Sequence, residues 1–80
     1  MSEAQTKLTF GQRAVGLTFN PSGNSDVIEL KTAAAIFIDL CHALRESSKG
    51  DFEIKRMLSV AITEAQTAQM WAVKAATWES

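Results

Sequence analysis

The sequence is poor in the residues on which most disulfide and metal sites depend. It has one cysteine, Cys41, and one histidine, His42, in 80 residues. A single cysteine excludes an intrachain disulfide and favours a cytosolic protein. One thiol, one imidazole and scattered carboxylates do not have the spacing that zinc sites use. We therefore expect no metal and no cofactor.

The sequence also lacks long apolar runs and any excess of basic residues. No stretch approaches the roughly 20 apolar residues that span a bilayer, and the opening MSEAQTKLTF has no apolar core, so we expect no membrane contact and no signal peptide. The formal net charge is −1, and the eight Lys and Arg residues are dispersed. Binding to a DNA or RNA polymer requires a stripe of basic residues, so the composition argues against a polymer partner. A small anionic ligand remains possible, because two or three basic groups can converge locally.

Paired catalytic groups are missing as well. Cys41 and His42 are neighbours in a helical pattern, where adjacent positions point about 100° apart, so they do not form a nucleophile and base pair. Glu64 has no second carboxylate one turn away on its face, which leaves paired acid and base catalysis unsupported. The sequence predicts a binding protein, not an enzyme.

What the sequence has in abundance is apolar surface for its length. Hydrophobic residues make up 46% of the 80. A chain this short buries only about 60% of the surface that it exposes when unfolded. A thin two-helix unit cannot hide so much apolar surface from water, so we expect a compact homo-oligomer.

Hydrophobic periodicity predicts an all-α fold in one domain, with a short N-terminal helix ahead of a long hairpin. Residues 1–8 are polar, and we expect them to be frayed. Residues 9–25 contain a short helix, opened by a capping box of Thr9 with Gln12, and then a loop at the NPSG turn.

Two long amphipathic helices are predicted after that loop. The first covers residues 26–48 and is opened by a capping box of Asp26 with Glu29, and the second covers residues 51–78 with Asp51 as its cap. The apolar positions of the first helix recur in steps of three and four, at Val27, Leu30, Ala34, Phe37, Cys41 and Leu44. The short link between the helices predicts an antiparallel hairpin.

The second long helix carries two distinct rows. The row that faces the first helix is rich in alanine, and such small side chains allow the two backbones to approach closely. Its alanines are Ala61, Ala65, Ala68, Ala72 and Ala75. The other row is half aromatic and half polar, at Val60, Glu64, Thr67, Trp71, Lys74 and Trp78. Two interpretations stay open: an oligomer contact with tryptophan anchors and a polar rim, or an interface that also encloses a ligand.

The segment RAVGLTFNPSG has features that suit a small anionic ligand with a flat ring. Arg13 offers a planar fork for a phosphate, and Phe19 offers a ring to a base. The turn after Phe19 is expected to expose main-chain N–H groups, and the Asp26 cap leads into a helix N-terminus that favours anions. Each feature also has a purely structural interpretation, since a phenylalanine is commonly a core residue and NPSG is commonly only a turn.

Two strings carry a resemblance to a known family. The segment from Gly11 to Gly23, with RAVGLTFNPSG, and the string AITEAQTAQMWAVKAATW from Ala61 to Trp78 resemble the phage anti-CBASS cyclic-nucleotide sponges, whose helical hairpin domain is shared with an anti-Thoeris sponge. The resemblance implies a homohexamer in the cytoplasm of the infected bacterium. It also implies capture, without cleavage, of cyclic dinucleotides such as cyclic GMP-AMP and of cyclic trinucleotides, which blocks CBASS defence.

The resemblance also implies an aromatic side chain stacked on the purine and a basic side chain at the phosphate. The chain has no tyrosine, so stacking falls to Phe10, Phe19 or a tryptophan. The predicted ligand-binding residues are Phe10, Arg13, Phe19, Asn20, Ser22, Gly23, Lys31, Arg56 and Lys74. The predicted oligomer contacts are Val60, Thr67, Trp71 and Trp78.

Two other functions are kept as alternatives. One is a structural helical oligomer or adaptor without a small-molecule ligand, in which the tryptophan row only holds copies together. The other is a nuclease that degrades the messenger, against which the scarcity of catalytic groups argues. Residue spacing alone does not rank guanine against adenine.

Overall fold

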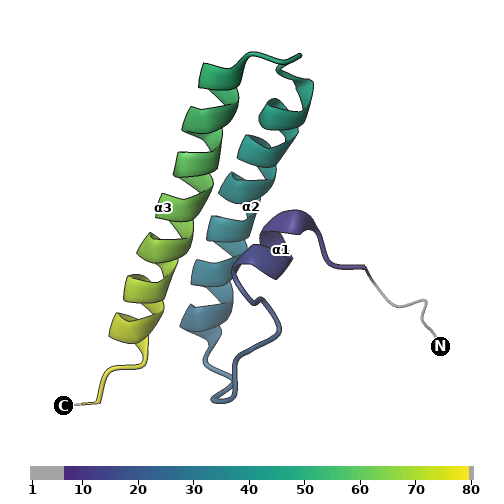
Figure 1. Ribbon diagram of the computed structural model, residues 1–80. Helices are drawn as coiled ribbons and strands as arrows, with labels where there is room; N and C mark the ends of the chain where they lie inside the picture. The colour runs from purple at the N-terminus through teal and green to yellow at the C-terminus, as the bar shows by residue number, and fades with distance from the viewer. Residues whose placement is uncertain (1–6, 80) are drawn as a thin grey trace.

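The computed structural model describes residues 7–79, so the predicted fraying of residues 1–6 lies outside the described residues. Within this range the chain forms three helices and no strand: α1 (Phe10–Ala14), α2 (Ser25–Ser47) and α3 (Phe52–Ala76). The long helices α2 and α3 run antiparallel, side by side, and α1 packs beside α2 (Figure 1). The prediction of an all-helical hairpin is thereby confirmed.

Side-chain caps fix where each helix begins. The capping box at α1 is present, because Thr9 Oγ1 accepts from the Gln12 N–H at 3.1 Å and Gln12 Oε1 accepts from the Thr9 N–H at 2.9 Å. The capping box predicted at Asp26 was wrong. Asn24 caps α2 instead, and its Oδ1 accepts from the N–H groups of Asp26 and Val27. Asp26 then lies in the first turn, where its carboxylate is favourable to the helix dipole.

The link between α2 and α3 is tight. Lys49 and Gly50 both have positive φ, 53° and 85°, which reverses the chain over a few residues. Asp51 caps α3 by accepting from the N–H groups of Glu53 and Ile54, as predicted. At its other end α3 stops at Ala76 and not at Trp78. Thr77 is the C-cap, and the Trp78 N–H donates to the Ala75 carbonyl at 3.2 Å, which does not continue the α-helical bond pattern.

The short helix α1 is fastened to α2 at a glycine. The Gly11 N–H donates to Asp39 Oδ1 at 2.7 Å, and Gly11 lies so close to the Ala35 carbonyl that a Cβ there would overlap it. The Phe10 ring stacks on the His42 ring with centroids 4.2 Å apart. These contacts place the residues after α1 over the first turns of α2.

The core is small and lies where α1 meets the hairpin. It consists of Val15, Ala35, Ile38, Cys41 and Ile62. The predicted apolar row of α2 was therefore misplaced in part, because Phe37 and Leu44 are 50% and 59% exposed. The buried row runs through Val27, Lys31, Ala35, Ile38 and Cys41. Its last three members form the core with Val15, which follows α1, and Ile62 of α3.

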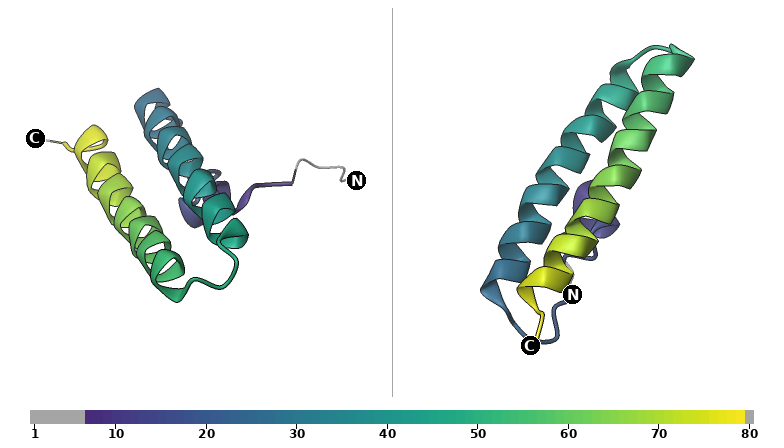
Figure 2. Two further views of the ribbon diagram at one scale, coloured as in Figure 1. Left: turned by 90° about the horizontal axis from the view of Figure 1, so that it is seen from above. Right: turned by 90° about the vertical axis from the view of Figure 1, so that its left-hand side faces the viewer.

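The alanine-rich seam of α3 is only partly closed. Ala61 and Ala65 pack against the core. Ala68 and Ala72 line an open hollow of about 400 Å³ between the long helices. The hairpin with α1 against one side (Figure 2) has a shortest principal extent of 12 Å. A molecule this thin leaves many large apolar side chains exposed.

Candidate functional site

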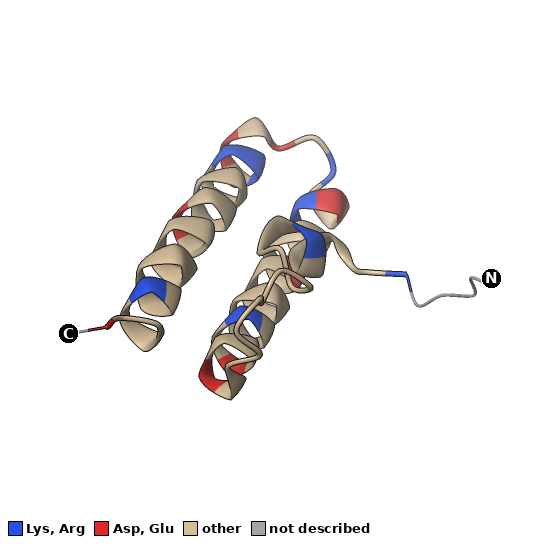
Figure 3. Cartoon of the chain, turned by 90° about the horizontal axis from the view of Figure 1, so that it is seen from below, with Lys and Arg blue, Asp and Glu red and all other residues tan. Residues whose placement is uncertain are grey.

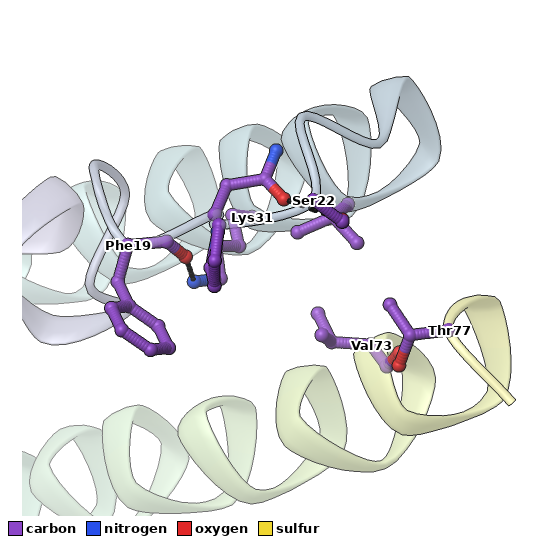
Figure 4. A pocket seen from close by; sticks show the side chains of 8 residues that line it. Phe19, Ser22, Lys31, Val73 and Thr77 are labelled. Atoms are coloured by element: carbon purple, nitrogen blue, oxygen red, sulfur yellow. Dashed lines mark hydrogen bonds between the residues drawn. The ribbon is translucent and has the colours of Figure 1, made fainter.

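A pocket lies where the loop after α1 passes the end of α3. Its volume is about 320 Å³, and its lining comes from the loop, from α2 and from α3 (Figure 4). The lining residues are Phe19, Asn20, Pro21, Ser22, Val27, Lys31, Val73 and Thr77. This volume is near the lower limit of about 300–1,000 Å³ that is common for small-molecule sites.

Lys31 is the charged group of this pocket, and its position is fixed. The residue is only 6% exposed, and its Nζ donates to the Gly16 carbonyl at 2.9 Å and to the Phe19 carbonyl at 2.6 Å. Within residues 7–79 no carboxylate forms an ion pair with it. An ammonium group has three N–H donors, so one remains for a ligand. Lys31 thus occupies a position in the buried row of α2, where its ammonium group binds two carbonyls of the loop.

Phe19 brings an aromatic ring to the same place. Its side chain is 72% exposed, and the Lys31 ammonium lies 5.6 Å from its ring centroid. The Phe19 N–H donates to the Gly16 carbonyl at 2.9 Å. Together with the Lys31 contact to its own carbonyl, this bond fixes the Phe19 backbone while its ring stays open to a planar ligand.

The NPSG turn is closed on itself. The Gly23 N–H donates to the Asn20 carbonyl at 3.0 Å, and the Asn24 N–H donates to Ser22 Oγ at 3.3 Å. Asn24 Oδ1 accepts the first free N–H groups of α2. The main-chain anion site that the sequence predicted here is therefore largely filled by the protein's own groups, and Lys31 is the remaining charged donor.

Two predicted ligand residues near α1 lie outside this pocket. Phe10 packs against the core and His42, and its ring is also 5.6 Å from the Arg45 guanidinium carbon. Arg13 is exposed and donates to the Leu8 carbonyl at 3.2 Å. Within one chain both residues serve the docking of α1.

The other predicted residues are spread over the molecule. Arg56 is near the α2–α3 link and pairs with Glu53 at 2.7 Å; the guanidinium lowers the pKa of that carboxyl. Gly23 has a φ of 67° in the turn but does not line the pocket. Lys74 lies in a second hollow. Only Phe19, Asn20, Ser22 and Lys31 are brought together.

The second hollow is an open patch on the outer side of α3. Its volume is about 420 Å³, and its lining residues are Trp71, Lys74, Ala75 and Trp78. The two tryptophans are 68% and 67% exposed, and the Lys74 ammonium is 5.9 Å from the Trp78 ring. Val60 and Thr67 are exposed on the same helix. The predicted row is thus unpartnered within one chain.

Sequence reasoning missed the α3 side of the first pocket. Val73 and Thr77 are one turn apart and face the loop across the pocket (Figure 4). An antiparallel hairpin puts the end of its second helix beside the start of its first. The predicted topology could therefore have identified Val73 and Thr77 as residues that lie near the loop. Asn24 was missed because Asp26, with Glu29 three residues later, matched the capping-box pattern, whereas Asn24 has Val27 at that distance.

Ligating and basic side chains are dispersed over the described part of the chain. No group of three or more His, Cys, Asp or Glu side chains within residues 7–79 could hold a metal ion. Figure 3 shows Lys and Arg interspersed with Asp and Glu over the described helices, without a continuous basic stripe. No described helix has the length and hydropathy needed to cross a membrane.

Comparison with known protein families gives a match over most of the chain. The family model of the Acb2/Tad1 hairpin domain matches residues 12–77, which include the whole of α2 and α3 and the loop that carries Phe19. No curated protein and no solved structure matches the chain.

Proposed function

Because the chain belongs to the Acb2/Tad1 hairpin family, we propose that it binds cyclic oligonucleotide messengers and sequesters them without cleaving them. The ligands are cyclic dinucleotides such as cyclic GMP-AMP, and cyclic trinucleotides. The place of action is the cytoplasm of a bacterium infected by a phage. There the protein lowers the free messenger concentration and so blocks CBASS defence.

The observation that carries this proposal is the pairing of Phe19 with Lys31 in one pocket. A base can stack on the exposed Phe19 ring, and a phosphate can accept the remaining N–H of the Lys31 ammonium. Lys31 is desolvated and already oriented, so binding orders little in the protein. Asn20 and Ser22 add polar groups at the rim of the pocket.

One chain by itself has too few binding groups for the affinity that sequestration of a messenger requires. Competition with a host receptor needs a nanomolar Kd, about −12 kcal/mol. A stacked base contributes roughly 1–3 kcal/mol and a charge-assisted hydrogen bond about 1.5–3 kcal/mol. We therefore propose that the pocket is completed by neighbouring copies, so that symmetry repeats the ring and the ammonium for the second base and phosphate.

Self-association is supported by the exposed apolar surface. Trp71 lies on α3 and Trp78 just after its end, both about two-thirds exposed, and Phe37, Leu40 and Leu44 are at least half exposed on α2. Such surface marks contact sites in soluble proteins. We propose a homohexamer in which Trp71, Trp78, Val60 and Thr67 contact other copies. Arg13, Phe10, Gly23, Arg56 and Lys74 are proposed as ligand contacts that such an assembly would bring to a pocket.

Isothermal titration of the full chain with 3′,3′-cyclic GMP-AMP and with cyclic tri-AMP tests the proposal. The complex is then heated, and the released nucleotide is examined by chromatography. We expect tight binding and recovery of the intact cyclic nucleotide. Absence of binding to any cyclic di- or trinucleotide would overturn the proposal, and linear products would indicate a nuclease.

The alternative is a structural helical oligomer or adaptor without a small-molecule ligand, and the unpartnered tryptophan row favours it. It predicts that Trp71→Ala breaks assembly while Phe19→Leu changes no measurable property. Sizing by light scattering, combined with the titration above, separates the two functions.

A further inference from the structure

The side of the hairpin that faces away from α1 is apolar and open. On α2, the contacts with α1 are made by Ala35, Asp39 and His42. Phe37 and Leu44 each follow one of these residues by two positions, which places them about 200° away around the helix. Both side chains are at least half exposed. The described part of the chain therefore leaves this side of α2 without a packing partner.

The same side of α3 carries small residues. Gln66 marks the side toward α1, because its Nε2 donates to the Ala14 carbonyl at 3.0 Å. Ala68 follows by two positions and so points about 200° away from it. Ala68 is exposed and lines the open hollow between the long helices, whose volume is about 400 Å³. Five of the eight residues that line this hollow are alanines, and none is charged.

We call this side of the hairpin the back face. It is defined by Phe37, Leu40 and Leu44 on α2 and by Ala65, Ala68 and Ala72 on α3. A row of large side chains thus runs beside a hollow of small ones. Gln69 is the polar residue of the hollow, and its Oε1 is buried without a hydrogen-bond partner among residues 7–79. The hollow is therefore incomplete in one chain, in its packing and in its hydrogen bonding.

A second copy of the chain fits this face by shape. A twofold axis parallel to the hairpin lays α2 of each copy over α3 of the other, and it keeps every residue at its own level along the helices. Phe37 lies at the level of Ala65, because both line the same hollow. The large row of one copy then meets the small residues of its partner, and symmetry repeats the contact. The face thus carries both halves of an isologous interface.

The size of the back face also suits a pair of copies. Helix α2 has 23 residues, and at about 1.5 Å per residue it is about 35 Å long. Two helices about 10 Å apart then present a face about 20 Å wide, or about 700 Å² in area. A standard protein interface buries about 800 Å² on each partner. The back face is therefore large enough for one stable contact.

We propose that the back face is an interface at which two copies of this chain pair into a four-helix bundle. The inference rests on the self-association in the proposed function, but it uses a different surface. The patch with Trp71 and Trp78 shares no lining residue with the hollow. A hexamer built from twofold pairs needs at least two different contact faces. The back face holds each pair together, and the tryptophan row joins the pairs.

The test places a charge in the hollow. Ala68→Lys puts an ammonium group where the large side chains of the second copy pack, and an unpaired charge is costly to bury. Its matched control is Ala43→Lys, the same change at an exposed alanine of α2 that does not line the hollow. Both sites are exposed within one chain, so both variants should keep their helical content in circular dichroism.

The mass of each variant is measured by analytical ultracentrifugation over a concentration series, without ligand. We expect Ala68→Lys to raise the dissociation constant of the pair roughly tenfold or more, and Ala43→Lys to leave it within about twofold. A second pair of variants removes a ring instead of adding a charge. Phe37→Ala should also weaken pairing, whereas Phe52→Ala, at an exposed phenylalanine that begins α3, should not.

The proposal is overturned if Ala68→Lys assembles like the unsubstituted protein, or if Ala68→Lys and Ala43→Lys lose pairing equally. An unsubstituted protein that stays monomeric at every concentration would also overturn it, and the back face would then belong to a different partner. Titration with 3′,3′-cyclic GMP-AMP and cyclic tri-AMP is a separate measurement. If the paired protein binds neither nucleotide, the proposed function fails and the interface stands.

Discussion

The molecule has two places where a lysine lies near an aromatic ring, and they are built differently. Lys31 lies 5.6 Å from the Phe19 ring centroid, is 6% exposed and donates to two backbone carbonyls. Lys74 lies 5.9 Å from the Trp78 ring on an exposed stretch of α3. The first pair is held by the fold, whereas the second is free to adapt to whatever covers it.

This difference separates a pocket from a contact surface. A ligand that binds the first site meets a cation that is already desolvated and oriented, so little ordering is needed. The second site offers two large indole rings with little shape of their own, which is typical of anchors in protein contacts. We therefore propose that similar residue types at similar distances serve different purposes here, because their surroundings differ.

The largest effect on this comparison is expected from Lys31→Met. The change keeps the side-chain stem but removes the ammonium donor from the Gly16 and Phe19 carbonyls. The Gly16 carbonyl keeps the Phe19 N–H as a donor, so the Phe19 carbonyl is the one that loses its partner. A carbonyl left unpaired costs roughly 1–3 kcal/mol of the free energy of unfolding. Chemical denaturation measures the loss, and Lys74→Met is the matched control with an expected change below about 0.5 kcal/mol. Equal stability of the two variants would contradict the distinction drawn between the lysines.

The second effect concerns the tryptophan patch. Trp71→Ala should leave the helical content and secondary structure of the chain intact, because the indole is 68% exposed within one chain. It should weaken assembly by about 2 kcal/mol or more at each contact, as loss of a tryptophan anchor does. Light scattering over a concentration series measures the change. A variant of unchanged size would show that the patch is not a contact between copies.

A smaller effect is expected from Phe19→Leu. The ring is 72% exposed, so the unfolding free energy should change little, but ligand stacking should be lost. We expect ligand binding to weaken by roughly 1–3 kcal/mol, measured by titration with 3′,3′-cyclic GMP-AMP. Phe52→Leu, at an even more exposed phenylalanine remote from the pocket, is the control. If both variants bind like the unsubstituted protein, Phe19 does not stack on the base.

The smallest effect is expected from Arg56→Gln. This guanidinium forms a fully exposed pair with Glu53, and solvent and salt screen such pairs so strongly that they add little to stability. The unfolding midpoint should therefore stay unchanged. Ligand affinity distinguishes the roles of Arg56: a clear loss at constant stability would support it as a phosphate contact in the assembly, and no loss would remove it from the proposed site.

The helices could be predicted from the sequence because caps and periodicity act locally. Thr9 with Gln12 and Asp51 were correct as caps, since each side chain reaches N–H groups within the next three residues. The start of α2 was harder, because Asn24 and Asp26 are both good caps and only the observed backbone distinguishes them.

The site was harder to predict because it depends on long-range contacts. Lys31 interrupts an apolar row, and its two carbonyl partners lie 12 and 15 residues away in a loop without periodicity. Phe37 and Leu44 were assigned to the contact with the second helix, but both are at least half exposed. Periodicity shows that a helix has apolar positions, but it does not show that α1 packs on one side of α2 and buries a different row. The hydrogen bonds from Gln66 to the Ala14 carbonyl and from Asn24 to the Ala76 carbonyl join residues 52 apart, which no local pattern reveals.

A crystal structure of the assembled protein with 3′,3′-cyclic GMP-AMP tests the central claim most directly. We expect a purine stacked on the Phe19 ring at about 3.5–4.0 Å, with a phosphate oxygen within hydrogen-bonding distance of Lys31 Nζ and other walls supplied by neighbouring copies. A ligand held only between Trp71 and Trp78, with the space beside Phe19 and Lys31 empty, would contradict the account.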